Sequence, residues 1–313
     1  MIATGALTLI FGKHQTSDFW GDCLRMWWVQ VRAKCRGVRR LVVYLDNGPK
    51  NSGVRTQFLK RMIEFSDKIT PPICDLADEN FSVIRCLSDD NETQSFFLET
   101  MAIVLSRMPE SASEVEVANT VNHLCYLFLA MSRPASRTVQ GLWAELFVIH
   151  QSMDKLAMMQ GWRIDDTDVH DFNFGTSRLE VKSTSARRRS HYFSYEQVHP
   201  PVGTEAFVAS VFVQRVANGL ALGTIWDDIR GQLASTPDLQ LKLDQVCMQS
   251  LGEDWNEART ATFDSELANE SLAYFDVKEI PRLERSQPIG VSEIRFKSDL
   301  ENSVPLTAAP SCQ

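Results

Sequence analysis

The stretch that most constrains the fold spans residues 168 to 184, where apolar and polar residues alternate on either side of a glycine. This alternation predicts two half-buried β-strands. Gly175-Thr176 lies between them and predicts a two-residue type II′ turn, whose twist matches that of the flanking strands. In that register Asp171 lies directly opposite Glu180. The segment therefore predicts a β-hairpin with two carboxylates on one face.

Two opposed carboxylates need a positive partner. Directly opposed side chains have Cβ atoms roughly 4.5–5.5 Å apart, and like charges placed so are destabilising. A hard divalent cation such as Mg²⁺ would relieve the repulsion, since carboxylate oxygens are its preferred ligands. Lys182 points to the same face as Glu180 because strand side chains alternate. An ammonium there can orient a water and offset charge on a phosphate, so the pattern indicates phosphodiester hydrolysis.

Asp171, followed after eight residues by Glu180-Val181-Lys182, resembles the D…(D/E)xK signature of restriction-type PD-(D/E)XK nucleases. His170 stands where the family name has proline, which leaves the metal ligand unchanged. The resemblance implies that Asp171 and Glu180 bind Mg²⁺ or Mn²⁺ together with the Val181 carbonyl. Lys182 would assist the attacking water. The alternative is a solvated strand face with an incidental ion pair, because E-x-K is common on half-exposed strands.

A predicted helix upstream carries another carboxylate. Its apolar stripe has helical spacing and comprises Leu142, Leu146, Ile149, Met153 and Leu156. Glu145 lies beside Leu142 and Ile149, so its side chain is expected to face at least partly inward. The resemblance implies that Glu145 tunes the site or holds a second ion. The alternative is a glutamate at the rim of the stripe, or one that favours the helix dipole.

Downstream residues supply polar and basic groups. A helix is predicted to begin at residues 193 to 198, and the resemblance matches Gln197 to the glutamine that many of these enzymes place near the site. A basic patch within an otherwise acidic domain comprises Arg178, Arg187, Arg188 and Arg189. Such a patch beside a metal site is expected to contact a DNA backbone without reading sequence. The alternative is a solvated basic loop. His191 and His199 have no nucleophile motif beside them and are expected to be structural or exposed.

Residues 1 to 70 are basic, whereas the rest of the chain is acidic. Two strands and two helices are predicted there, at residues 5–11, 39–45, 19–31 and 54–65. Their order resembles the middle of a DDE-type insertion-sequence transposase, which has an RNase H-like fold. Asp46 would match the second catalytic carboxylate. The other carboxylates of such a site are missing, so Asp46 is expected to be a relic in a non-functional fragment. A genomic fusion or a mis-set start codon would explain it.

The segments beyond Pro71-Pro72 alternate between helices and strands. Helices are predicted at residues 94–108, 114–131, 226–233 and 239–252. The apolar run at residues 206–214 predicts a strand buried on both faces. A turn at residues 217–219 is expected to lead to a second strand at 220–225, and residues 291–297 form the last expected strand.

The predicted fold is α/β: a restriction-endonuclease-like mixed sheet flanked by helices, preceded by a helical region and a partial RNase H-like α/β fragment. The expected parts are a transposase-like fragment at 1–70, a helical part at 72–135, a nuclease-like core at 136–300 and a flexible tail at 301–313. At 313 residues, the chain is long enough for two domains.

Composition narrows the functional classes. No apolar run approaches a membrane span, and no basic n-region marks a signal peptide. Seven cysteines without a C-x-x-C pair suit neither structural zinc nor a disulfide framework, so reduced thiols in a cytoplasm are expected. The resemblance implies a DNA endonuclease of bacterial defence or restriction-modification systems. The alternative is a non-catalytic subunit that binds DNA or a partner; a transposase remnant is the third reading. Partner subunits and a homodimer stay open.

Overall fold

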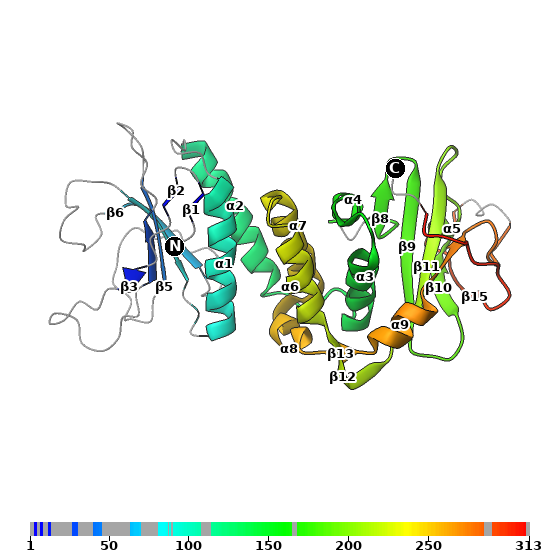
Figure 1. The fold of residues 1–313 in the computed structure, drawn as a ribbon. Coiled ribbons are helices and arrows are strands. Elements are labelled where there is room, and N and C mark those ends of the chain that lie inside the picture. The colour runs from blue at the N-terminus through cyan, green and yellow to red at the C-terminus, as the bar shows by residue number, and fades with distance from the viewer. Residues whose placement is uncertain are drawn as a thin grey trace. The chain divides into compact units, whose positions relative to one another are not determined.

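The chain forms two compact units, residues 1–133 and 134–313. The computed structural model describes residues 90–107, 114–164, 168–284 and 290–310, together with Ser88 and separate strand segments between Ala3 and Cys86. Each unit has its own strands and helices (Figure 1). Asp46 lies outside the described residues, as do most of the helices predicted at 19–31 and 54–65.

The first unit contains a five-stranded mixed sheet in the order β3-β4-β5-β7-β6, in which only β5 and β7 are parallel. Its strands are β3 (Gly12–Lys13), β4 (Trp27–Gln30), β5 (Arg40–Leu45), β6 (Ile63–Ile69) and β7 (Phe81–Cys86). The short strands β1 (Ala3–Thr4) and β2 (Leu7–Thr8) pair with each other. The strand predicted at 39–45 is confirmed as β5. The helices predicted at 19–31 and 54–65 are wrong where β4 and β6 overlap them, because pairing with neighbouring strands overrides local helical spacing.

Two helices complete the described part of this unit, α1 (Asn91–Arg107) and α2 (Glu114–Ala130). The Asp90 carboxylate caps α1 by accepting the Thr93 backbone N–H at 2.7 Å. Phe97 of α1 packs edge-on against Phe128 of α2, with ring centroids 5.8 Å apart. Both helices were predicted from their apolar spacing, and both are confirmed.

The second unit is built on a four-stranded mixed sheet in the order β14-β11-β9-β8. Its strands are β8 (Phe172–Phe174), β9 (Ser177–Thr184), β11 (Glu205–Phe212) and β14 (Ala273–Asp276). β9 and β11 are parallel, whereas β8 and β14 pair antiparallel at the two edges. Five of the eight β11 residues are buried, which confirms the strand predicted from the apolar run at 206–214.

The connection from β9 to β11 contains β10 (Ser190–Ser194) and α5 (Tyr195–Val198), and β10 pairs with β15 (Arg295–Asp299). This two-stranded ribbon lies on one side of the sheet in Figure 1, and helices lie on the other. A buried apolar cluster joins ribbon and sheet through Phe193, Val198, Ala206, Val208, Phe275, Val277, Ile280 and Leu300.

Helix α3 (Val139–Gln151) is the central helix of this unit. Thr138 caps it by accepting the Gly141 N–H at 3.1 Å, and all eight residues from Leu142 to Ile149 are buried. It lies between β9 and α6 (Leu222–Gln232) in Figure 1. Because α3 is covered on both sides, its polar side chains are buried as well, and Glu145 is one of them.

The other helices of the unit are α4 (Lys155–Gly161), α7 (Pro237–Leu251), α8 (Trp255–Arg259) and α9 (Ser265–Ser271), with a short 3₁₀ turn at Gly252–Asp254. Among the described residues no helix combines the length and apolar character of a membrane span.

Several predicted boundaries were wrong. β12 (Arg215–Ala221) runs through the turn predicted at 217–219 and pairs with β13 (Thr262–Phe263). Of the strand predicted at 220–225, residues 220 and 221 belong to β12, and α6 begins at Leu222. β10 extends to Ser194, so the helix at 193–198 begins later. Met153 lies beyond the end of α3 and is fully exposed, so it is no part of the apolar stripe.

We predict opposite effects of alanine at two glycines. Gly175 has a φ of 60°, and Gly175→Ala should destabilise the protein by about 1–2 kcal/mol because alanine disfavours that backbone conformation. Gly231 lies exposed in α6 with open space around it, so Gly231→Ala should stabilise the protein by about 0.5–1 kcal/mol. Urea unfolding of both variants measures this, and equal shifts of the two would contradict the assigned turn.

Candidate active site

The β8–β9 hairpin adopts the predicted register. Phe172 pairs with Leu179 and Phe174 with Ser177 around the turn Gly175-Thr176. Gly175 has positive φ and Thr176 does not, as in a type II′ turn. Just before β8, Asp171 is held against β9 because its Oδ2 accepts the Val181 backbone N–H at 2.8 Å.

The second oxygen of Asp171 is also engaged. Arg163 Nη2 lies 3.0 Å from Asp171 Oδ1, and the Arg163 backbone N–H donates to the Asp171 carbonyl at 2.9 Å. The Asp171 side chain is only 4% exposed. This aspartate is therefore a buried carboxylate with a partner at each oxygen.

Glu180 has one engaged oxygen and one unpaired oxygen. Its Oε1 accepts hydrogen bonds from Lys182 Nζ and Gln197 Nε2, both at 2.6 Å. Its Oε2 is buried without a hydrogen-bond partner among the described residues. A buried carboxylate oxygen left without a donor is energetically costly, unless another positive group completes the site.

Gln197 holds the Lys182 ammonium in place. Its Oε1 accepts from Lys182 Nζ at 3.2 Å and from the Ser194 backbone N–H at 3.1 Å, while its Nε2 also donates to the Val169 carbonyl at 3.1 Å. The Ser194 side chain caps α5 by accepting the Gln197 N–H, which completes a capping box. The glutamine matched to the family from the sequence thus contacts both Glu180 and Lys182.

Glu145 reaches the same region from α3. It is 5% exposed, and its Oε2 accepts from Trp162 Nε1 at 2.8 Å and from Arg137 Nη1 at 2.9 Å. The prediction of an inward-facing glutamate is confirmed. Both of its oxygens are engaged, because Arg137 Nη1 also lies 3.2 Å from Oε1.

Burial perturbs two of the carboxyl groups. Burial first, and the nearby charge of Asp171 second, together raise the pKa of Glu145 to about 8 and that of Glu180 to about 7. The arginines and Lys182 oppose these shifts. Pairs of carboxyl groups that resist full ionisation in one buried place are typical of functional sites.

The residues present suit a divalent hard cation in part. Asp171 and Glu180 offer carboxylate oxygens, and the unpaired Oε2 of Glu180 is the donor atom that such an ion prefers. Within the described ranges, no group of three His, Cys, Asp or Glu side chains is arranged to hold a metal. Any ion here would therefore need main-chain, water or substrate oxygens as further ligands.

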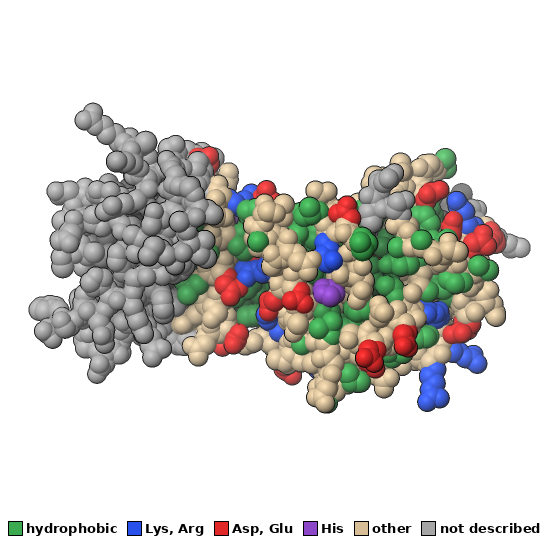
Figure 2. Space-filling model, viewed as in Figure 1, with side chains coloured by type: hydrophobic (Ala, Val, Ile, Leu, Met, Phe, Trp, Pro, Cys, Tyr) green, Lys and Arg blue, Asp and Glu red, His purple; other side chains and the backbone are tan. Residues whose placement is uncertain are grey.

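The four predicted basic residues do not form one patch. Arg187 and Arg188 are exposed in the loop after β9, and Figure 2 shows basic side chains projecting from this unit. Arg178 instead donates to the carbonyls of Gly175 and Ser177 at the hairpin turn, at 2.5 and 3.0 Å.

Arg189 points inward. Its Nη1 donates to the carbonyl and hydroxyl oxygens of Ser210 at 2.8 and 3.0 Å, and its guanidinium lies 4.7 Å from the centroid of the Phe212 ring. Desolvation lowers its pKa. The structure thus does not bring Arg189 into the exposed basic surface.

Three residues near the carboxylates were not singled out from the sequence: Arg137, Trp162 and Arg163. Arg137 immediately precedes the Thr138 cap of α3 and reaches one side of Glu145, while Trp162 follows α4. No spacing motif marks them, since their contacts to Glu145 and Asp171 depend on how α3, α4 and β8 pack together.

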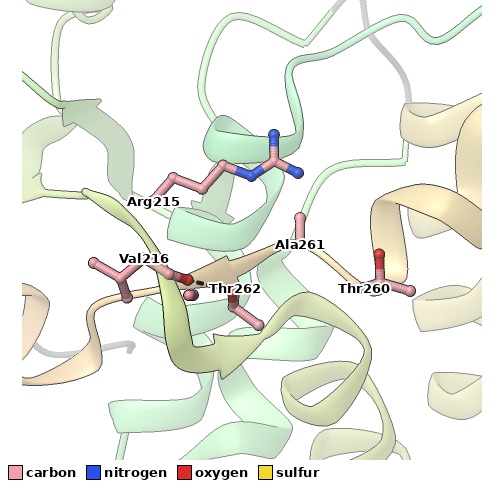
Figure 3. Close-up of a pocket in the computed structure, with 6 residues that line it drawn as sticks. Arg215, Val216, Thr260, Ala261 and Thr262 are labelled. Carbon is pink, nitrogen blue, oxygen red and sulfur yellow. Dashed lines mark hydrogen bonds between the residues drawn. The ribbon is translucent and has the colours of Figure 1, made fainter.

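A surface hollow of ≈ 390 Å³ lies elsewhere in this unit (Figure 3). It is lined by Arg215, Val216 and Ala217 of β12, by Thr260 and Ala261 just before β13, and by Thr262 of β13. None of these residues belongs to the carboxylate cluster.

A family model described as "Putative PD-(D/E)XK family member, (DUF4420)" matches residues 51–301. The chain belongs to this family. The match includes Glu145, the β8–β9 hairpin and Gln197, and it confirms the resemblance and the nuclease-like fold inferred from the sequence. It begins upstream of residue 72, where the family-like part was expected to start. This PD-(D/E)XK family member also matches, over residues 3–74, a model described as the Rhodopirellula transposase DDE domain. No curated protein and no solved structure gives a significant match.

His191 should make stability pH-dependent. It is buried with Nε2 2.8 Å from Ser210 Oγ, and burial lowers its pKa to about 4. The unfolded chain takes up this proton at about pH 6.5, so stability is retained above that pH and is lost as the pH falls toward 4. The loss is up to about 3 kcal/mol. In His191→Gln, urea unfolding across pH 7 to 4 should show a smaller decline, and an unchanged decline would contradict this assignment.

Proposed function

We propose that this protein is a metal-dependent endonuclease that hydrolyses phosphodiester bonds in DNA. The observation that carries the proposal is the grouping of Asp171, Glu180 and Lys182 on one hairpin, with Glu180 Oε2 buried and unpaired. A divalent cation would satisfy that oxygen and offset the repulsion between the two carboxylates. Family membership supports a phosphodiesterase on this nuclease-like fold.

In this proposal each residue of the hairpin has a separate role. Asp171 and Glu180 would hold Mg²⁺ or Mn²⁺, with the Val181 carbonyl as a further ligand. Such an ion would stabilise the negative charge that develops on the phosphate during hydrolysis. Lys182, fixed by Glu180 and Gln197, would orient the attacking water and donate hydrogen bonds to the phosphate.

Glu145 would act mainly through its charge. Its oxygens are bound by Arg137 and Trp162, and its pKa is raised to about 8. A cation beside Asp171 would favour the ionised form of Glu145, and the negative charge of that form would strengthen the attraction for the cation. A second ion would have to share these oxygens with Arg137.

The biological setting is part of the proposal. We place the enzyme in bacterial defence or restriction-modification, acting alone or with partner subunits. The division into a non-functional transposase-like fragment at 1–70, a helical part at 72–135, a catalytic core at 136–300 and a flexible tail at 301–313 belongs to the same proposal.

One observation favours a second candidate, a non-catalytic subunit that binds DNA or a partner. Asp171 and Glu145 are each paired with an arginine, so these two carboxylates are partly neutralised without any metal. In that case the hairpin charges would stabilise the fold and have no catalytic role.

We predict that the full chain cleaves plasmid DNA in the presence of Mg²⁺. Asp171→Asn, Glu180→Gln and Lys182→Ala should each lower the cleavage rate by about 10²-fold or more, because each removes a group that acts on the reacting phosphate or its ion. The matched control is Glu196→Gln, an exposed carboxylate next to Gln197, which should cleave like the parent. Absence of cleavage by the parent, without Mg²⁺ binding in calorimetry, would favour the non-catalytic subunit.

The exposed and inward-pointing arginines should behave differently. The Arg187→Gln, Arg188→Gln double variant should bind DNA more weakly, and the slope of log affinity against log salt should fall by about 0.9 for each phosphate that the variant no longer neutralises. Its unfolding free energy should not change. Arg189→Gln should instead lose about 2 kcal/mol of stability, because Ser210 loses a charged donor inside the protein. Fluorescence anisotropy at several salt concentrations and urea unfolding separate the two effects.

A further inference from the structure

The three buried carboxylates of the candidate site each form an ion pair with a basic side chain of the protein. The three pairs are Glu145 with Arg137 at 2.9 Å, Asp171 with Arg163 at 3.0 Å, and Glu180 with Lys182 at 2.6 Å. The pairs differ in what a divalent ion would encounter.

At Glu180 one oxygen is available to an ion, because the buried Oε2 has no hydrogen-bond partner among the described residues. At Asp171 both carboxylate oxygens already have partners: the Val181 N–H donates to Oδ2 at 2.8 Å, and Arg163 Nη2 lies 3.0 Å from Oδ1. An ion shared by Asp171 and Glu180 would therefore come to lie close to the Arg163 guanidinium. The positive ion and the positive guanidinium would repel each other strongly there, since the effective dielectric constant inside a protein is far below that of water.

Arg163 has a donor that its present partners do not use. Its side chain is 16% exposed, and besides Asp171 it donates from Nη1 to the Asp168 carbonyl at 3.0 Å. Its Nε–H is buried without an acceptor among the described residues. A guanidinium with an unused donor gains by moving to a ligand that accepts two hydrogen bonds in parallel, and a phosphate is such a ligand.

We propose that Arg163 is an exchangeable counter-cation: it pairs with Asp171 in the metal-free protein and transfers to a DNA phosphate when a divalent ion binds. The inference rests on the proposed function, since it assigns Asp171 to the metal. Arg163 is thus a positioning residue that makes metal binding and DNA binding depend on each other. The free protein binds the ion weakly, and DNA strengthens that binding by accepting the displaced guanidinium.

Calorimetric titration of the full chain with Ca²⁺ tests the proposal, because Ca²⁺ prefers the same oxygen ligands. Arg163→Met removes the competing charge, so it should bind Ca²⁺ about tenfold or more tightly than the parent in the absence of DNA. Arg163→Lys keeps the charge and should bind about as weakly as the parent. A residue that only stabilised the fold would give weaker binding in both variants.

The second measurement repeats the titrations with a short DNA duplex present. The parent should gain at least about tenfold in Ca²⁺ affinity from DNA, and by reciprocity DNA affinity should rise by the same factor with Ca²⁺. Arg163→Met should lose most of this coupling. Arg163→Lys keeps the positive charge but cannot give a phosphate two parallel hydrogen bonds, so it should retain only part of the coupling. This variant keeps the proposal testable even if Arg163→Met lowers stability.

Failure of this inference differs from failure of the proposed function. If Asp171→Asn abolishes Ca²⁺ binding but Arg163→Met does not strengthen it, the metal site stands and the exchange of Arg163 is refuted. If the parent shows no Ca²⁺ binding with or without DNA, the metal-dependent function itself is refuted.

Discussion

The antiparallel pairing of β8 with β9 is the constraint on which the candidate site depends. The two-residue turn at Gly175-Thr176 sets the register, and a shift by one residue would send Glu180 and Lys182 to the opposite face of the sheet. The hydrogen bond from the Val181 N–H to Asp171 fixes the aspartate at the end of the hairpin. The geometry of the carboxylates thus follows from a turn and one side-chain to main-chain hydrogen bond.

The cost of burying three carboxylates is offset by elements that come together only in the folded protein. α3 brings Glu145 and, just before its cap, Arg137; the segment after α4 brings Trp162 and Arg163. α5 brings Gln197, which links Glu180 to Lys182. Buried charges that are paired and hydrogen-bonded are tolerated. Glu180 Oε2 has no such partner among the described residues, so it is the atom at which a bound cation would stabilise the protein most directly.

Apolar spacing and alternation predicted helices and strands correctly where one face of the element is buried. They predicted the two helices of the first unit, α3, the hairpin and the central strand β11. They failed at 217–219, where a Gly-containing sequence typical of a turn lies within β12, because Gly219 passes close to the Phe263 backbone of β13. They also failed at Met153, where helical spacing continued past the end of α3.

The sequence by itself determined the α/β class, the hairpin register and the placing of Asp171, Glu180 and Lys182 on one hairpin, since these follow from alternation, turn chemistry and spacing along one chain. Glu145 joined these candidates through the resemblance to the PD-(D/E)XK nucleases. The tertiary structure decided which groups surround these residues. Arg163 comes to Asp171 from eight positions away, and Arg189 turns inward while Arg187 and Arg188 stay exposed. The reason is physical: the partner of a buried charge is set by the packing of separate elements, and no periodicity along the chain encodes that packing.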